Sequence, residues 1–241
     1  MTINFNLIPD KFFKEIERFT NYYIEVSGGY HSTYTVLEFY RKGYKNCYLL
    51  NNRTYLEYFE CKENIDKLIE ITGYPINITY PNFKKYLNMN CLMRESFKNI
   101  NLATGIKNYR DFFPCCKVLK KYPAKSWINK NLLDNSLVIS SLTPYESFQR
   151  QMRLFELKKQ STYIRNHKTK GCYVGYPFRD LLYGNRKYTR KIIEPFFENK
   201  MRKYNLNVKH SGCKICPIRI MNPIMLEKND CSIKYNKIYN F

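Results

Sequence analysis

Apolar positions along the first 80 residues switch repeatedly between helical spacing and short strand-like runs. Helical spacing predicts three helices, over residues 5–20, His31–Arg41 and Glu63–Thr72. Short apolar or alternating runs between them predict strands at residues 22–26, 47–50 and 76–80. Strands that alternate with helices in this way form a parallel sheet with right-handed crossovers. Asp10 is the expected N-cap of the first helix.

The second half of the chain continues this pattern less regularly. A fourth strand is expected at residues 137–141, with helices at Pro144–Leu157 and Ile192–Tyr204. Residues 82–114 are typical of a helix plus an active-site loop, and the Lys-, Arg- and Gly-rich stretch 158–191 is typical of a long arm over that site.

These elements predict one α/β domain. We expect a Rossmann-like parallel sheet of about five strands flanked by helices, with a cysteine-rich C-terminal segment. The domain would span residues 1–217 and end in a tail, residues 218–241.

The turn Ser27-Gly28-Gly29 lies between the first strand and the second helix. Glycines let backbone N–H groups approach an anion, and the N-terminus of the helix adds a favourable dipole. Ser27, Ser32 and Thr33 can cap the helix or bind a phosphate oxygen. In an open parallel sheet ligands bind beyond the carboxyl ends of the strands, where this turn falls. We therefore predict a phosphate site here; the alternative is an ordinary strand-turn-helix corner.

The charge of the chain indicates a large anionic partner. The formal net charge is +21 over 241 residues, more than one nucleotide requires, and RNA or DNA is the simplest polyanion. The alternative is a compositional bias toward Lys, Asn, Ile and Tyr. No apolar run is long enough for a membrane span, and residues 1–10 do not resemble a secretory signal. We expect a cytoplasmic protein without a membrane partner.

Nine cysteines in such a chain favour metal ligands or redox groups over disulfides. Four of them form two close pairs, Cys115-Cys116 and Cys213-x-x-Cys216. Adjacent cysteines suit the separate irons of a [4Fe–4S] cluster better than one tetrahedral zinc, although zinc and no metal stay open. Five scattered cysteines are expected to be small buried hydrophobic residues for the most part: Cys47, Cys61, Cys91, Cys172 and Cys231.

Five stretches carry motifs that follow one another in a fixed order: Ser27-Gly28-Gly29-Tyr30-His31-Ser32, Cys115-Cys116-Lys117-Val118-Leu119-Lys120-Lys121-Tyr122-Pro123, Glu146-Ser147-Phe148-Gln149-Arg150, Tyr176-Pro177-Phe178-Arg179-Asp180 and Gly212-Cys213-Lys214-Ile215-Cys216-Pro217. In this order they resemble motifs of the phosphoadenosine phosphosulfate (PAPS) reductase family of adenine-nucleotide α-hydrolase-like proteins. This family includes assimilatory adenylyl-sulfate reductases and the sulfurtransferases of DNA phosphorothioation.

The resemblance implies a role for each motif. The backbone amides of Gly28, Gly29 and Tyr30 would hold a phosphate or sulfate of an adenine nucleotide (ATP, adenylyl sulfate or PAPS), with hydroxyl contacts from Ser27 and Ser32. Lys120 would lie between a cluster and this anion. Further nucleotide or anion contacts would come from the third motif, at Glu146, Ser147 and Arg150. The ligands of a [4Fe–4S] cluster would be Cys115, Cys116, Cys213 and Cys216.

Three departures from the family pattern qualify these roles. His31 stands where the family has an aspartate that helps to orient Mg²⁺ or the nucleotide. Leu142-Thr143-Pro144 replaces the expected Gly-x-Arg before Glu146. Asp230-Cys231-Ser232-Ile233-Lys234 is only a partial match to the mobile tail whose cysteine attacks sulfur in the reductases.

Three functional hypotheses follow. The first is an adenine-nucleotide-binding Fe–S enzyme of sulfur metabolism that transfers sulfur to a nucleic acid. The second is an adenylyl-sulfate or PAPS reductase in which Cys231 attacks sulfur and a thioredoxin-like reductant releases sulfite. The third is a non-catalytic family member that binds nucleic acid.

Overall fold

Six strands form a single sheet in the part of the chain that the computed structural model describes, namely residues 7–54, 57–81, 120–146, 148–166, 172–181, 195–197, 199–204 and 206. The strands are β1 (Asn21–Glu25), β2 (Cys47–Asn52), β3 (Ile76–Thr79), β4 (Ser136–Ile139), β5 (Ile164–Asn166) and β6 (Tyr173–Gly175). The helices are α1 (Asp10–Ile16), α2 (Tyr30–Arg41), α3 (Phe59–Thr72), α6 (Tyr122–Asn131) and α7 (Phe148–Lys159). Within the described ranges no helix is both long and apolar enough to cross a membrane.

The strand order is β3-β2-β1-β4-β6-β5, and every pair is parallel except the edge pair β5–β6. The chain runs outward from β1 through β2 to β3 and then returns to the other side of β1 as β4. Connections therefore leave β1 and β4 in opposite directions. Such a switch point opens a crevice at the carboxyl ends of the two strands, which is where ligands bind in sheets of this type.

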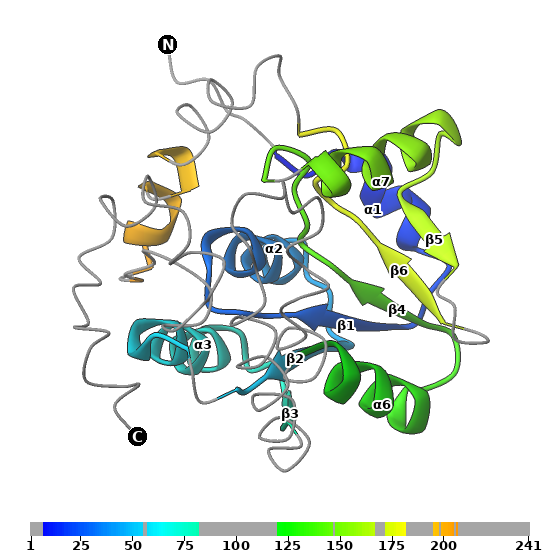
Figure 1. Cartoon of the computed structure of the whole chain (residues 1–241). Helices are drawn as coiled ribbons and strands as arrows, with labels where there is room; N and C mark the ends of the chain where they lie inside the picture. Colours follow the sequence, from blue (N-terminus) through cyan, green and yellow to red (C-terminus); the bar gives the residue numbers. More distant parts are fainter. Residues whose placement is uncertain are drawn as a thin grey trace, which may run out of the picture.

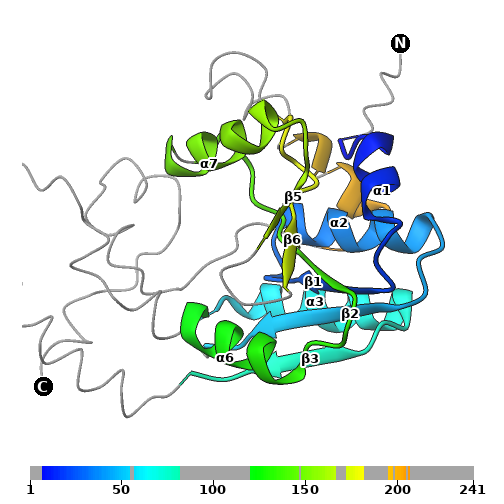
Figure 2. The same ribbon diagram turned by 90° about the vertical axis from the view of Figure 1, so that its right-hand side faces the viewer.

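Alternate residues of each strand belong to two separate cores. On one face, Ile24 and Leu49 pack with residues of α1, α2 and α3. On the other face, Tyr23 and Leu50 pack with Ile128 of α6 and with Leu154 of α7. Figure 1 shows α2 and α3 on one side of the sheet and α6 on the other, and in Figure 2 α6 and α7 lie to the left of α1 and α2. Since helices cover both faces of the sheet, most side chains of the central strands are buried, and the sequences of these strands are largely apolar.

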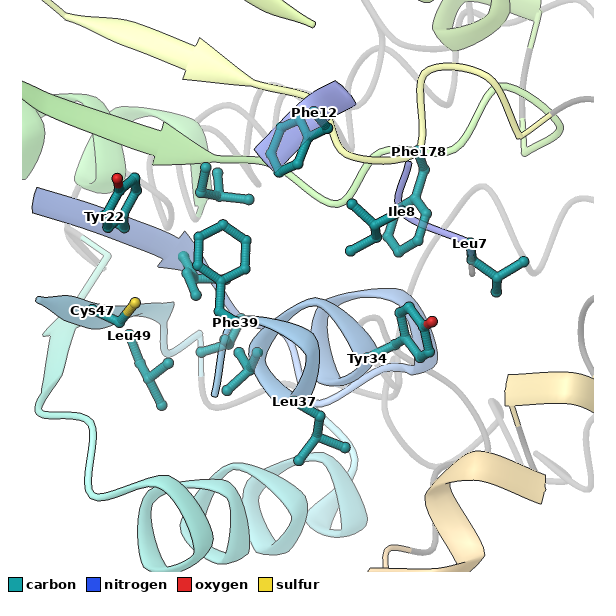
Figure 3. Packing of buried hydrophobic residues seen from close by; sticks show 14 of the residues in the cluster. Leu7, Ile8, Phe12, Tyr22, Tyr34, Leu37, Phe39, Cys47, Leu49 and Phe178 are labelled. Atoms are coloured by element: carbon teal, nitrogen blue, oxygen red, sulfur yellow. The ribbon is translucent and has the colours of Figure 1, made fainter. Parts of the chain in front are cut away.

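Aromatic rings fill much of the α1–α2 core. The Phe12 and Phe39 rings lie 6.3 Å apart, centroid to centroid, and Phe39 also contacts the rings of Phe13, Tyr22 and Tyr44. Figure 3 shows Phe12, Phe39 and Tyr22 converging between α1, α2 and the sheet. Edge-to-face contacts of this kind add to the gain from burying the rings and fix their packing.

The α/β Rossmann-like fold expected from the sequence is confirmed, but the sheet has six strands. Residues 158–191, expected to form a long arm, include β5 and β6, and β6 pairs with β4 inside the sheet. The strands are only three residues long and lie among basic residues, so apolar periodicity did not reveal them. Helix α6 was not predicted, because only Ala124 and Ile128 of its ten residues are buried.

Several boundaries also differ from the prediction. Helix α1 is shorter than residues 5–20 and its N-cap is Pro9, so the expected capping by Asp10 is wrong; Asp10 instead pairs with Lys42 at 2.8 Å. Helix α7 begins at Phe148 instead of Pro144, because residues 144–146 form a turn. Residues 195–197 and 199–202 are helical, as expected for 192–204. Residues 82–114, the tail 218–241 and the end of the predicted domain lie outside the described residues.

Phe39→Ala tests how much stability the aromatic core supplies. Phe39 is fully buried, so truncation leaves a cavity and is expected to lower the free energy of unfolding by about 3–5 kcal/mol. Phe59→Ala is the matched control, since the Phe59 side chain is 61% exposed, and it is expected to cost less than about 1 kcal/mol. Urea denaturation followed by circular dichroism measures both, and equal losses would contradict this account of the core.

Candidate functional site

A cavity of about 300 Å³ lies at the carboxyl ends of β1, β2 and β4, at the switch point of the sheet. Its lining comes from the glycine turn, from three strand ends and from the starts of the segments that form α6 and α7. The lining residues are Glu25, Val26, Ser27, Gly29, His31, Ser32, Leu50, Asn51, Asn52, Glu57, Lys120, Ser140, Ser141, Leu142, Glu146 and Arg150. The size and mixed polarity of the cavity suit a small, charged organic ligand.

The turn after β1 depends on Gly28. Its φ is +71°, a left-handed conformation that side chains rarely adopt. A Cβ atom at this position would lie 2.2 Å from the carbonyl oxygen of Cys61 in α3. Only glycine therefore lets the chain turn sharply beside α3 and enter α2.

Three carbonyl groups of this turn accept hydrogen bonds from within the protein. Asn51 Nδ2 donates to the Val26 carbonyl at 2.8 Å, and Asn64 Nδ2 donates to the Gly28 carbonyl at 3.4 Å. The Gly29 carbonyl accepts from the Ser32 hydroxyl at 3.1 Å and from the backbone N–H of Thr33 at 3.0 Å. The acceptors are thus held by neighbouring side chains and by the first turn of α2.

The N–H groups of Gly28 and Gly29, by contrast, bond to no acceptor among the described residues. Gly29 is the N-cap of α2 and no side chain caps the helix, so the expected capping by Ser27, Ser32 or Thr33 does not occur. Uncapped amides at a helix N-terminus attract an anion through their hydrogen-bond donors and through the helix dipole.

The hydroxyls of the turn lie next to these amides. Ser32 Oγ lies 3.3 Å from Ser27 Oγ and accepts from the Ser27 N–H at 3.2 Å. Both serines line the cavity, whereas Thr33 is fully buried, and its hydroxyl has no hydrogen-bond partner among the described residues. The cavity therefore offers backbone and hydroxyl donors on one wall.

His31 reaches the cavity from the first turn of α2 and is held by aromatic neighbours. Its Nε2 atom hydrogen bonds to the hydroxyl of Tyr145, which follows β4. The imidazole also contacts the rings of Phe197 and Phe178, with centroids 4.8 and 5.8 Å away. The imidazole of His31 is therefore held in place at the edge of the cavity by Tyr145, Phe197 and Phe178.

Glu146 is held ionised at the start of the segment that leads into α7. Burial by itself would raise the pKa of its carboxyl, but His31, Arg150 and the Thr143 hydroxyl together lower it below the ordinary value. Thr143 Oγ1 donates to Glu146 Oε2 at 2.8 Å, and Arg150 forms an ion pair with the same carboxylate. Thr143 belongs to the stretch that replaces the family Gly-x-Arg, and here it positions Glu146.

Sequence reasoning missed the acids and amides that complete the lining. Glu25 ends β1 and accepts a hydrogen bond from Ser140 at the end of β4; burial raises the pKa of its carboxyl despite this bond. Asn51 and Asn52 end β2, and Glu57 follows nearby. Polar residues at the ends of several predicted strands were the available signal, because the carboxyl ends of parallel strands meet at one edge.

The structure brings together most of the expected nucleotide-site residues that it describes. One cavity is lined by Ser27, Gly29, His31, Ser32, Lys120, Glu146 and Arg150, which are up to about 120 positions apart in sequence. Gly28 lies in the same turn, and Tyr30 begins α2. The remaining expected site residues lie outside the described part of the chain: Ser147, Cys115, Cys116, Cys213, Cys216 and Cys231.

The three described cysteines, Cys47, Cys61 and Cys172, have buried side chains, as expected from the sequence. Burial raises the pKa of the Cys47 thiol to about 12 and that of Cys172 to about 11, so both are protonated near neutral pH. No group of three or more His, Cys, Asp or Glu side chains arranged to hold a metal ion occurs among the described residues. The expected cluster ligands all lie outside that set.

Gly28→Ala tests the close approach of the glycine turn to α3. We expect a larger loss of unfolding free energy than for Gly43→Ala, by at least about 1–3 kcal/mol, because only the first adds a clash to the unfavourable φ. Gly43 has a similar φ of +78° but no atom within 4 Å of its Cβ position, which makes it a matched control. Urea denaturation of both variants measures the difference, and equal losses would contradict the clash.

No protein-family model matches this sequence, and no curated protein matches it either. Among solved structures, the chain is similar to a PAPS reductase from Candida auris in a phosphate complex, with a TM-score of 0.48 and 13% identity over 86% of this chain and 89% of that one. It is also similar to the U34-tRNA thiolase NcsA from Methanococcus maripaludis with its [4Fe-4S] cluster, with a TM-score of 0.44 and 15% identity over 92% of this chain and 72% of that one. A PAPS reductase, from the family that the five motifs resemble, is thus among the solved structures to which the chain is similar.

Proposed function

We propose that the cavity at the switch point binds an adenine nucleotide, with a phosphate or sulfate group at the glycine turn. The observation that carries this proposal is the pair of N–H groups at Gly28 and Gly29, which no described acceptor satisfies while the neighbouring carbonyls are bonded. The first N–H groups of any helix lack intrahelical acceptors, and at α2 no side chain caps them while Gly29, its N-cap, lines the polar cavity, which supports an anionic ligand there.

Cationic side chains in the lining of the same cavity support an anionic ligand. Lys120 and Arg150 both line the cavity and can form charge-assisted hydrogen bonds to phosphate or sulfate oxygens. The polar groups at the ends of β1 and β2, including Glu25 and Asn52, can accept from or donate to the ribose and base. The cavity thus offers donors for the charged end of a nucleotide and acceptors for its neutral end.

His31 indicates how this site differs from the family pattern. An imidazole cannot replace a carboxylate as a ligand for Mg²⁺, which prefers oxygen. We therefore assign this position to direct contact with the nucleotide anion, in the orientation fixed by Tyr145.

The sulfur chemistry in the proposal rests on the cysteine motifs. Four thiolates from Cys115, Cys116, Cys213 and Cys216 are the donor set that an iron–sulfur cluster requires, and a bound cluster would supply sites for sulfur or electron transfer. Lys120 follows Cys116 by four residues in the sequence and lines the cavity. This supports a common site for the cysteine segment and the nucleotide, in which Lys120 would bind the anion.

A sulfurtransferase acting on a nucleic acid fits these features best. Adenylation of an acceptor oxygen by ATP would release pyrophosphate, and attack by a sulfide-level sulfur on the atom that bears this oxygen would then expel AMP. The nucleotide cavity would serve the first step and the cysteine segment the second. The net charge of +21 supports a polyanionic acceptor.

Isothermal titration calorimetry with ATP, adenylyl sulfate and PAPS tests nucleotide binding. We expect binding of at least one of them, and at least tenfold weaker binding of adenosine, which lacks the anion. Lys120→Gln is expected to weaken nucleotide binding about tenfold or more, since a hydrogen bond to a charged group contributes about 1.5–3 kcal/mol. Lys125→Gln, an exposed lysine on α6 outside the cavity, is the control that should bind as the wild type does.

Equal effects of the two lysine variants, or no binding of any nucleotide, would overturn the proposed site. If the protein released sulfite from adenylyl sulfate and Cys231→Ser abolished this release, the result would contradict sulfur transfer to nucleic acid and support the reductase reaction.

Anaerobic purification with iron and acid-labile sulfide analysis tests the cluster. We expect about four iron and four sulfide per chain, and visible absorbance. Cys115→Ala is expected to lose the iron, the sulfide and the absorbance. Cys172→Ala is expected to keep all three, because it removes a buried thiol that packs against the sheet. Zinc in place of iron, or equal metal content in the two variants, would contradict the cluster assignment.

A further inference from the structure

The positive charge of the chain is distributed unevenly over its helices. Helix α7 contains four cationic residues and one acidic residue, and α6 contains two lysines and no acid and directly follows Lys120 and Lys121. On the opposite face of the sheet, α3 contains four acidic residues and two lysines, while α1 and α2 are each balanced. Of the five labelled helices, α6 and α7 on one face are therefore basic, and α1, α2 and α3 on the other are neutral or acidic. The helical residues 199–202, which join the α1–α2 core through Met201, add the cations Lys200 and Arg202 on that other face.

The cations of α6 and α7 are on the solvent side of these helices. Arg153, Lys158 and Lys159 of α7 are exposed, as are Lys121 before α6 and Lys125 and Lys130 within it. The buried positions of the two helices, Ile128 and Leu154 among them, pack on the sheet. We call the six exposed cations, together with Lys120 and Arg150, the basic face.

Aromatic side chains lie exposed among these cations. Phe155 of α7 is 48% exposed with Lys159 Nζ 5.1 Å from the centre of its ring, and Tyr122 at the start of α6 is 47% exposed. Met152, one turn before Phe155, is also exposed. Cations that bind a phosphate backbone, interleaved with rings on which bases stack, are the two components of single-stranded nucleic acid sites.

Two members of the basic face, Lys120 and Arg150, also line the cavity. Lys120 precedes α6 and Arg150 belongs to α7. In Figure 2 the two helices lie on the same side, left of α1 and α2. A strand that follows the exposed cations would thus be led to the carboxyl edge of the sheet.

We propose that the basic face binds a single-stranded segment of nucleic acid, with its phosphates on the cations of α6 and α7 and a base stacked on Phe155. The inference rests on the proposed function, in which a nucleic acid receives the sulfur, and it identifies the surface that presents this acceptor to the cavity. The proposal assigns no nucleic-acid contact to α1, α2 and α3 on the other face.

Fluorescence anisotropy with labelled single-stranded 20-nucleotide RNA and DNA tests the proposal on the full chain. The first variant combines Arg153→Gln, Lys158→Gln and Lys159→Gln on α7. Its matched control combines Lys11→Gln, Lys14→Gln and Lys62→Gln, which removes three exposed cations from α1 and α3. Both triple variants have the same net charge, and circular dichroism verifies that they are folded.

The α7 triple variant is expected to bind the oligonucleotides at least tenfold more weakly at 100 mM salt. Because three phosphate contacts are lost, the slope of log affinity against log salt concentration should fall in magnitude by about 2. The control triple variant should keep the wild-type slope. Phe155→Ala should weaken binding about tenfold through lost stacking, whereas Phe59→Ala, the exposed aromatic residue on α3, should not. RNA bound more tightly than DNA, or the reverse, identifies the kind of acceptor.

Equal loss in the two triple variants, absence of nucleic-acid binding by the wild type, or equally tight binding of labelled polyglutamate would overturn the inference. An unchanged affinity of Phe155→Ala would overturn the stacking that it requires. Calorimetry of the α7 triple variant with the nucleotide separates this failure from that of the proposed function, because Arg153, Lys158 and Lys159 lie outside the cavity.

Discussion

The close approach of Gly28 to the backbone of Cys61 is the constraint on which the site depends. A left-handed residue without a side chain lets β1 turn directly into α2 while α3 packs against the turn. The same geometry directs the turn carbonyls to Asn51, Asn64 and the first turn of α2, and leaves the amides of Gly28 and Gly29 without described acceptors. The turn thus bonds three of its carbonyl acceptors within the protein, while two of its donors have no described acceptor.

The topology of the sheet brings the other components to this turn. Since β4 returns beside β1 instead of continuing past β3, the segments that follow β1 and β4 diverge, and a cavity remains between them. The cavity also receives three charged residues from the segments around α6 and α7. Lys120 lies just before α6, Glu146 lies between β4 and α7, and Arg150 lies in the first turn of α7. The two carboxyl groups in the cavity have different surroundings. His31, Arg150 and the Thr143 hydroxyl lower the pKa of Glu146, whereas burial raises the pKa of Glu25.

The two faces of the sheet have different characters. The face covered by α1, α2 and α3 holds a large aromatic core under helices whose charges cancel or are acidic. The face covered by α6 and α7 has a smaller core and strongly basic helices that adjoin the cavity. The exposed side of α7 therefore lies away from the Phe12–Phe39 packing, which belongs to the other core.

The sequence by itself determined the alternating α/β plan, the strand-glycine-helix turn and the excess of positive charge. Periodicity and a pair of glycines are visible within a single stretch of chain, and the charge follows from composition alone. None of these features depends on how the chain folds. The sequence did not reveal β5 and β6 or α6, whose short or weakly apolar segments are stabilised by neighbours in the sheet. Only the tertiary structure decided that His31 bonds to Tyr145, that Glu25 and Asn51 join the cavity, and that the two basic helices α6 and α7 cover the same face of the sheet. Each of these depends on residues far apart in sequence, which only the pairing of strands and the packing of helices bring together.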